Sequence, residues 1–137
     1  MKINKKVLAL LPLLLFGLIF LLNILTNRNE AKGALLYKNY CANCHMDQGE
    51  GLRGLIPPLA KADYLQKHQG DLACIIRYGM KGEIVVNGQS YKQAMPGNAE
   101  LSDIEITNLI NYINRQWGNE IPERSVQQVR KDLAACE

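Results

Sequence analysis

Three residues with reactive side chains stand close together early in the chain, in Cys41-Ala42-Asn43-Cys44-His45. Two cysteines three positions apart, with a histidine directly after the second, form the C-x-x-C-H pattern of covalent haem attachment. Each thiol can add to one vinyl group of a haem, and the histidine on the same turn can then ligate the iron. The motif therefore predicts one covalently held haem c, and with it redox chemistry or gas binding.

Other C-x-x-C sites are zinc half-sites, thioredoxin-like redox pairs and disulfides. Zinc needs four ligands, and outside the motif the only histidine or cysteine residues are His68, Cys74 and Cys136, with no second paired motif. A thioredoxin-like pair belongs beside a βαβ pattern, and no such pattern surrounds Cys41. We therefore favour haem attachment.

The N-terminal segment differs in composition from the rest of the chain. Three lysines precede an uncharged, mostly apolar run at residues 7–25. This run exceeds the about 7–15 residues of a secretory h-region, approaches the about 20 of a spanning helix, and is not followed by an A-x-A-like cleavage site. We expect residues 1–27 to be a cytoplasmic stub and transmembrane signal anchor; a cleaved signal peptide is the alternative. By the positive-inside rule, the remainder lies on the periplasmic side of the bacterial inner membrane, where covalent haem attachment is completed.

The excess of positive charge belongs to this N-terminal segment. The chain has 16 Lys+Arg and 13 Asp+Glu, and the three excess cations are Lys2, Lys5 and Lys6, so the remainder is formally neutral. The pI of about 8.7 therefore reflects membrane topology and does not indicate nucleic-acid binding. Whether Arg53, Lys61 and Lys81 form a docking patch or an ordinary solvated surface stays open.

The remaining pattern predicts a nearly all-α domain. We expect a polar linker at 28–33, the domain at 34–120 and a helical tail at 121–137 packed on it. The first helix of the domain should run from about residue 34 into the haem motif. A capping box formed by Ser102 and Glu105 should open a strong amphipathic helix to about residue 117.

Shorter elements are expected between these two helices. Asp63 and Asp71 can cap helices at 63–68 and 72–78. Asn87-Gly88 between residues 84–86 and 89–91 predicts a two-residue β-hairpin, inserted as a flap on the helical domain.

The second axial ligand of the iron decides the function of a haem protein. The candidates are Met46, Met80, Met95 and His68. Met46 adjoins the proximal histidine and cannot reach the opposite face, His68 lies in a polar helix, and Met80 suits an apolar filler role. Met95 precedes a Pro-Gly turn just before the last long helix. Alone it could equally anchor the hairpin; beside the haem motif we favour it as the ligand, where its thioether would favour Fe(II) and raise the potential.

These residues together resemble a known family. Cys41, Cys44 and His45 early in the chain, Pro57 in the following loop and Met95-Pro96-Gly97 before a terminal helix resemble class I c-type cytochromes, over about residues 33–117. The resemblance implies a cytochrome c fold in which the first helix crosses the last one at Gly33, Tyr37, Leu109 and Tyr112. It also implies that the Pro57 carbonyl accepts a hydrogen bond from Nδ1–H of His45 and so orients the ring. We expect the haem pocket to be walled by Leu52, Ile56, Leu59, Ile76 and Tyr91.

Cys74 and Cys136 have no role in the minimum pattern of this family. Because unpaired thiols are unusual in an exported, oxidising compartment, we predict a Cys74–Cys136 disulfide that pins the tail helix to the domain. The alternative is a buried free Cys74 and a frayed terminus.

The chain is thus expected to be a membrane-anchored monohaem cytochrome c with a monomeric domain. Iron with two protein ligands has no open site for a substrate, so we expect an electron carrier and no enzyme. The resemblance implies redox partners in the respiratory chain: a quinol-oxidising complex as donor, and a terminal oxidase or nitrogen-oxide reductase as acceptor. The alternatives are a fixed haem subunit of a respiratory complex and a gas-binding sensor domain in which Met95 is off the iron.

Overall fold

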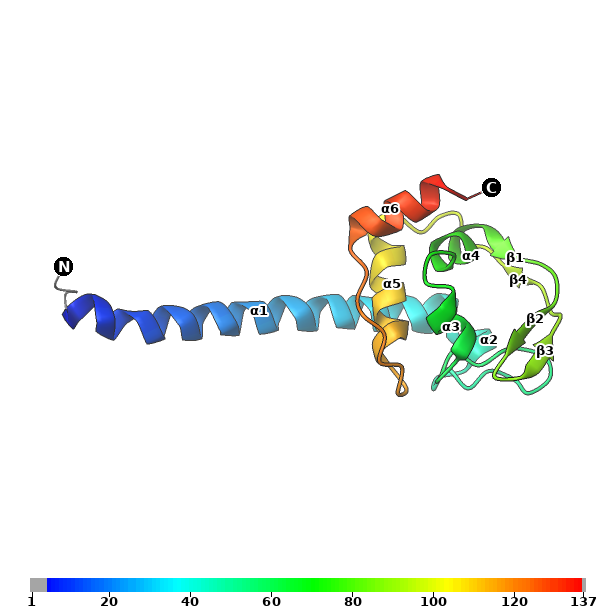
Figure 1. Ribbon diagram of the computed structural model, residues 1–137, viewed down its shortest axis with the longest axis horizontal. Helices are drawn as coiled ribbons and strands as arrows, with labels where there is room; N and C mark the ends of the chain where they lie inside the picture. The colour runs from blue at the N-terminus through cyan, green and yellow to red at the C-terminus, as the bar shows by residue number, and fades with distance from the viewer. Residues whose placement is uncertain (1–4, 137) are drawn as a thin grey trace.

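A long helix leads into a small, mostly helical domain in the computed structural model, which describes residues 5–136, without the side chains of residues 5–10 and 25–27 (Figure 1). The helices are α1 (Lys5–Tyr40), α2 (Ala42–His45), α3 (Asp63–Lys67), α4 (Leu72–Tyr78), α5 (Asp103–Arg115) and α6 (Val126–Ala134). Four short strands, β1 (Gly79–Met80), β2 (Ile84–Val86), β3 (Gln89–Tyr91) and β4 (Met95–Pro96), form two antiparallel pairs.

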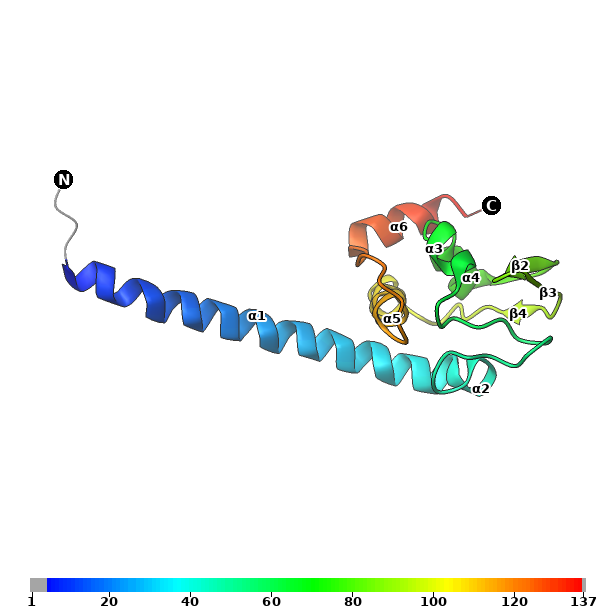
Figure 2. The same cartoon turned by 60° about the horizontal axis from the view of Figure 1, so that its bottom comes forward.

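Helix α1 is continuous, so the apolar run and the first helix of the domain form one element (Figures 1 and 2). The expected linker at 28–33 is helical, and the helix does not begin at residue 34. The reason lies in the sequence: this stretch contains Glu30, Ala31 and Lys32, which favour a helix, and no proline. Within the described residues, Leu11–Tyr40 is the one helical stretch long and apolar enough to cross a membrane, by length and composition alone.

Helix α5 packs against α1, α4 and α6 and runs across α1 (Figure 1). The crossing is close because Gly33 has no side chain. A Cβ at this position would lie 2.5 Å from the carbonyl oxygen of Asn108 and 2.6 Å from Cβ of Tyr112. The predicted capping box is present at the start of α5, and Ile106, Leu109 and Ile110 are fully buried on its inner face. The amphipathic helix is therefore confirmed, although it ends at Arg115.

Helices α3 and α4 occupy the predicted segments, but neither has the predicted side-chain cap. Asp63 is the first residue of α3, and its carboxylate accepts a hydrogen bond at 2.7 Å from the backbone N–H of Asn87 in the hairpin turn. In return, the N–H of Asp63 donates to Oδ1 of Asn87 at 3.0 Å. The Asp71 carboxylate instead lies 2.9 Å from Nδ1 of His68. The capping prediction was wrong because both carboxylates have partners outside the helix that each was to cap.

The two strand pairs differ in how easily they could be predicted. Strands β2 and β3 pair through the predicted two-residue turn, where Asn87 and Gly88 have the positive φ angles of 50° and 78° that such a turn requires. Strands β1 and β4 pair Gly79 with Pro96 and Met80 with Met95. This second pair has only two residues in each strand, too few for an alternating pattern, and the sequence did not predict it.

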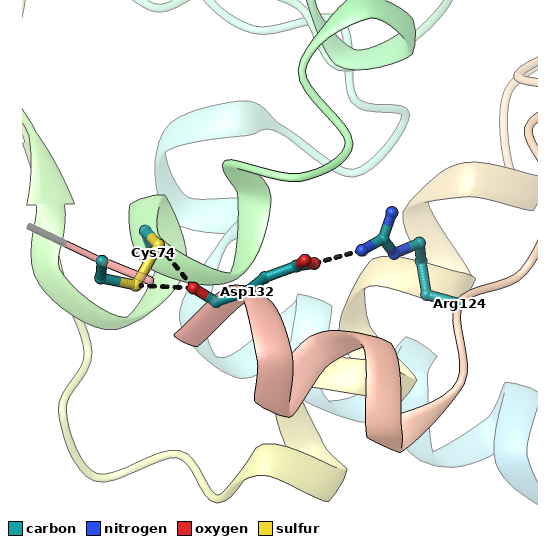
Figure 3. Close-up of a disulfide and its surroundings, with 4 residues drawn as sticks. Cys74, Arg124 and Asp132 are labelled. Carbon is teal, nitrogen blue, oxygen red and sulfur yellow. Dashed lines mark hydrogen bonds and ion pairs between the residues drawn. A yellow bond between two sulfur atoms is a disulfide. The ribbon is translucent and has the colours of Figure 1, made fainter. Parts of the chain in front are cut away.

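The C-terminal segment runs back along α5 and ends beside α4 (Figures 1 and 2). Helix α6 packs on α4 and α5, and its Val129 is fully buried in the core. Cys136, just after α6, forms a disulfide with Cys74 of α4, with an S–S distance of 2.07 Å (Figure 3). The tail is therefore part of the domain.

Candidate haem-binding site

The C-x-x-C-H motif begins where α1 ends. The N–H of Cys41 donates to the Tyr37 carbonyl at 2.8 Å, and the N–H of His45 donates to the Cys41 carbonyl at 2.9 Å. Met46 has a positive φ of 63° and ends the turn. The short helix α2 and its N-cap residue Cys41 therefore carry both thiols and the imidazole at the end of a long helix.

An apolar cleft opens beside this turn, between α2 and the strands. Its cavity volume is about 90 Å³. The cleft is lined by Tyr40, Cys41, Cys44, His45, Ile56, Pro57, Met80, Gly82, Ile84, Tyr91, Gln93, Ala94, Met95 and Pro96. Two thiols, an imidazole and a thioether on the walls of one apolar cleft are the donor set that a covalent haem needs.

His45 is held in the state that an iron ligand requires. The ring is 7% exposed, and its Nδ1 lies 3.1 Å from the carbonyl oxygen of Pro57. Because a carbonyl oxygen only accepts, the proton sits on Nδ1, and Nε2 keeps its lone pair for a metal. Burial lowers the pKa of His45, and the hydrogen bond to Pro57 opposes that shift. The imidazole is therefore neutral and oriented.

The loop after the motif positions the Pro57 carbonyl. The N–H of Gly51 donates to the His45 carbonyl at 3.0 Å, and the N–H of Leu59 donates to the Gly49 carbonyl at 2.7 Å. A Cβ at Gly51 would lie 2.6 Å from the Pro57 carbonyl oxygen, and the φ of Gly51 is 65°. Only glycine permits this approach, so Gly51 is what allows the loop to return to His45.

Two methionines face the cleft on the side of the strands. Met95 and Met80 are direct partners in the β1–β4 pair, and both line the cleft and an apolar hollow that adjoins it. The hydroxyl of Tyr64 donates to Sδ of Met80 at 3.7 Å. Met46 and His68 line neither space; the His68 ring stacks on Tyr64, with centroids 4.0 Å apart. The four candidates for the second ligand are thereby reduced to Met95 and Met80.

The expected pocket walls are only partly where they were predicted. Ile56 and Tyr91 line the cleft, and Leu59 lines the adjoining hollow. Leu52 is 47% exposed, and Ile76 is buried in the core away from both spaces. The places of Tyr40, Ile84 and Met80 at the cleft were not predicted from the sequence, because these residues reach it through strand pairing and the end of α1. Of these, only Ile84 carried a usable signal, its inward position in the hairpin.

The zinc alternative lacks ligands. No three His, Cys, Asp or Glu side chains come together as a possible metal site in residues 5–136. Burial, and then the nearby Cys44, raise the pKa of the Cys41 thiol to about 12. The motif cysteines are also not the pair that forms the disulfide.

These features define a covalent haem site in a small helical domain with one inserted hairpin. The family model for cytochrome c matches residues 30–117. Cytochrome c-552 of Thermus thermophilus is 39% identical over 94 residues, covering 66% of this chain and 71% of that protein. The cytochrome c subunit of alcohol dehydrogenase (quinone) from Gluconobacter oxydans is 34% identical over 93 residues, which are 66% of this chain but 19% of that subunit.

This chain belongs to the cytochrome c family. It is a class I c-type cytochrome with covalently attached haem c, and it is an electron carrier, with no enzymatic activity of its own.

Proposed function

We propose that this protein is a membrane-anchored monohaem cytochrome c that transfers single electrons on the periplasmic side of the bacterial inner membrane. Cys41 and Cys44 hold the haem, and His45 and Met95 ligate its iron. The observation that carries this proposal is the common cleft, whose walls include both thiols, the buried imidazole and the Met95 side chain. Bound haem supplies the one-electron chemistry.

The residues of the chain tune and protect that chemistry. The neutral imidazole of His45 keeps its orientation through the Pro57 carbonyl. A soft thioether from Met95 favours Fe(II) and so raises the reduction potential. Apolar walls, among them Ile84 and Tyr91, exclude water from the cleft. With two protein ligands there is no position for a substrate, which agrees with a carrier.

The anchor is α1. Lys2, Lys5 and Lys6 precede its apolar run and stay in the cytoplasm under the positive-inside rule. From the end of that run at Leu25 to Cys41 are 16 residues, or about 24 Å at 1.5 Å per helical residue. The haem is therefore held outside the hydrocarbon layer, where donor and acceptor must present their own redox centres. As partners we propose a quinol-oxidising complex and a terminal oxidase or nitrogen-oxide reductase.

A fixed subunit of a respiratory complex is the second candidate. The continuous helix α1 favours it, because a domain without a flexible linker moves little relative to its anchor. The alcohol dehydrogenase relative is by its name a cytochrome c subunit. Detergent extraction from native membranes followed by size-exclusion chromatography separates the two: a small monodisperse species supports the free carrier, and a large complex supports the subunit.

The first experiment is the optical spectrum of the purified holoprotein, oxidised, reduced and reduced under CO. We expect a low-spin c-type spectrum, the weak Met-to-Fe(III) band in the oxidised form, and no response to CO. A high-spin spectrum or rapid CO binding would remove Met95 from the iron and favour a gas-binding sensor instead.

A further inference from the structure

We propose that the C-terminal segment, residues 118–136, is a strap that keeps Met95 in its position at the cleft, and that Cys74 and Cys136 are positioning residues for the distal ligand. The strap lies beyond the residues matched by the cytochrome c family model, which end at 117. The inference rests on the proposed ligation of the iron by Met95.

The position of Met95 is set by the end of α4. Strand β1 follows α4 directly and pairs with the Met95 strand. The N–H of Asn98 donates to the Ile76 carbonyl at 2.8 Å. A Cβ at Gly97 would lie only 2.4 Å from the carbonyl carbon of Tyr78, so the loop rests on the backbone of α4. A displacement of α4 therefore displaces Met95.

The strap holds α4 from the other side. The disulfide joins Cys74, in the first turns of α4, to the end of the strap (Figure 3). A charged cluster adds a second connection, because the Asp103 carboxylate bonds Arg77 of α4 at 2.9 Å and Arg130 of α6 at 3.2 Å. Helix α4 is thus linked covalently to Cys136 just after α6, and the carboxylate of Asp103, the first residue of α5, bonds both α4 and α6.

The strap itself is attached at both ends, so it can resist such a displacement. At its start, the side chain of Asn111 on α5 accepts from the N–H of Arg124 at 2.7 Å and donates to the Arg124 carbonyl at 2.9 Å. At its end, both disulfide sulfurs lie 3.5 Å from the Asp132 carbonyl oxygen, and the Asp132 carboxylate pairs with Arg124 (Figure 3). Between them Val129 is fully buried.

The disulfide closes a loop of the chain that contains the proposed distal ligand, Met95. Cys74 and Cys136 are 62 positions apart, and Met95 lies between them in the sequence. Local opening of a weakly packed segment costs less than global unfolding, and the β1–β4 pair has only two residues in each strand. The strap should therefore raise the cost of opening the Met95 loop specifically, most visibly in ferric protein, where the thioether is the weaker ligand.

The test is imidazole binding to the ferric holoprotein, because imidazole takes the iron position only after Met95 leaves. In the double variant Cys74→Ala/Cys136→Ala, we expect imidazole to abolish the Met-to-Fe(III) band at least about tenfold faster than in the native protein, because the free energy of local opening of the Met95 loop is lower. The matched control is native protein in the urea concentration at which its free energy of unfolding equals that of the double variant. Far-UV circular dichroism measures both free energies. Equal rates in these two samples would mean that the strap adds only global stability, and would overturn the proposal.

A second pair of variants keeps the test decisive if the double variant yields no holoprotein. Arg130→Gln removes the α6 side of the Asp103 bridge and leaves Arg77 in place, so we expect imidazole binding to accelerate about twofold to fivefold. Lys67→Gln removes an exposed ion pair of α3, with Asp63, that does not touch α4, and should change nothing. If the double cysteine variant gives no holoprotein, equal rates of imidazole binding in Arg130→Gln and native protein reject the strap. A native ferric spectrum without the Met-to-Fe(III) band would instead reject the proposed ligation, and the strap with it.

Discussion

The two sides of the haem site are built in different ways. On the proximal side, the thiols and His45 lie on one helical turn, and the carbonyl that orients the imidazole belongs to Pro57, only twelve positions later. On the distal side, the proposed ligand Met95 pairs with Met80, its loop rests on the end of α4, and a disulfide joins α4 to Cys136, a residue distant in the sequence.

The difference concerns how each ligand can be lost. A position defined by one turn and one short loop stays formed until that turn unfolds. A position defined by contacts between several elements can open when any one of them moves. We therefore expect the distal ligand to be labile and tunable and the proximal ligand to be all-or-none.

The strongest test of this contrast is His45→Ala. The variant removes the proposed proximal ligand and its hydrogen bond to Pro57, so we expect the low-spin spectrum to be lost completely in any haem-containing protein, and restored by added imidazole. His68→Ala is the control, since that ring lies outside the cleft, against Tyr64. A low-spin spectrum in His45→Ala without imidazole would contradict the assignment.

The next largest effect separates the two methionines at the cleft. Met95→Ala should open the iron to CO and lower the midpoint potential by at least about 120 mV, two factors of ten for a one-electron couple. Met80→Ala should remain indifferent to CO, because it loses only an apolar contact and the bond from Tyr64. Redox titration and CO difference spectra of the two variants decide the matter. CO binding by Met80→Ala alone would exchange their roles.

The same contrast explains what could be predicted from the sequence. The C-x-x-C-H motif, the Pro57 offset and the Asn87-Gly88 turn are local patterns, and the structure has a helical turn, a hydrogen bond and a hairpin at those places. The capping box of α5 is equally local and was confirmed. Local patterns could be predicted because the physical interaction joins residues that are neighbours in the sequence.

The failures involve distant partners. Asp63 was expected to cap its own helix, but its carboxylate meets Asn87, 24 positions away. The β1–β4 pair, which places Met80 opposite Met95, is too short to have a periodicity. The linker at 28–33 was expected from polar composition, whereas packing of Gly33 on α5 and helix-favouring residues keep α1 continuous. For Asp63 a tertiary contact overrode the local preference, the β1–β4 pair had no local pattern to show it, and the continuity of α1 agrees with the helix-favouring residues 30–32.

A substitution in α1, at its crossing with α5, should lower the free energy of unfolding and leave the axial ligands of the iron unchanged. Gly33→Ala would place a Cβ 2.5 Å from the Asn108 carbonyl oxygen at the α1–α5 crossing, so we expect a loss of about 1–3 kcal/mol in the free energy of unfolding. Gly70→Ala is the matched control, because nothing lies within 4 Å of the added Cβ. Denaturant titration gives the stability and the optical spectrum gives the ligation. A changed axial-ligand spectrum in folded Gly33→Ala would show that the proximal side is less self-contained than its local contacts indicate.

The smallest effect should come from Pro57→Ala, which keeps the carbonyl that accepts from His45 but frees the backbone that aims it. A hydrogen bond weakened by about 0.5 kcal/mol makes the imidazole a poorer donor, which destabilises Fe(III) and should raise the midpoint potential by about 20 mV at 59 mV per factor of ten. Leu55→Ala changes an exposed side chain of the same loop and leaves the Pro57–Pro58 peptide unit intact, and protein-film voltammetry resolves such shifts. Equal shifts in both variants would assign the effect to loop stiffness, whereas a shift in Pro57→Ala alone assigns it to the orientation of His45, the one proximal feature expected to vary by degree.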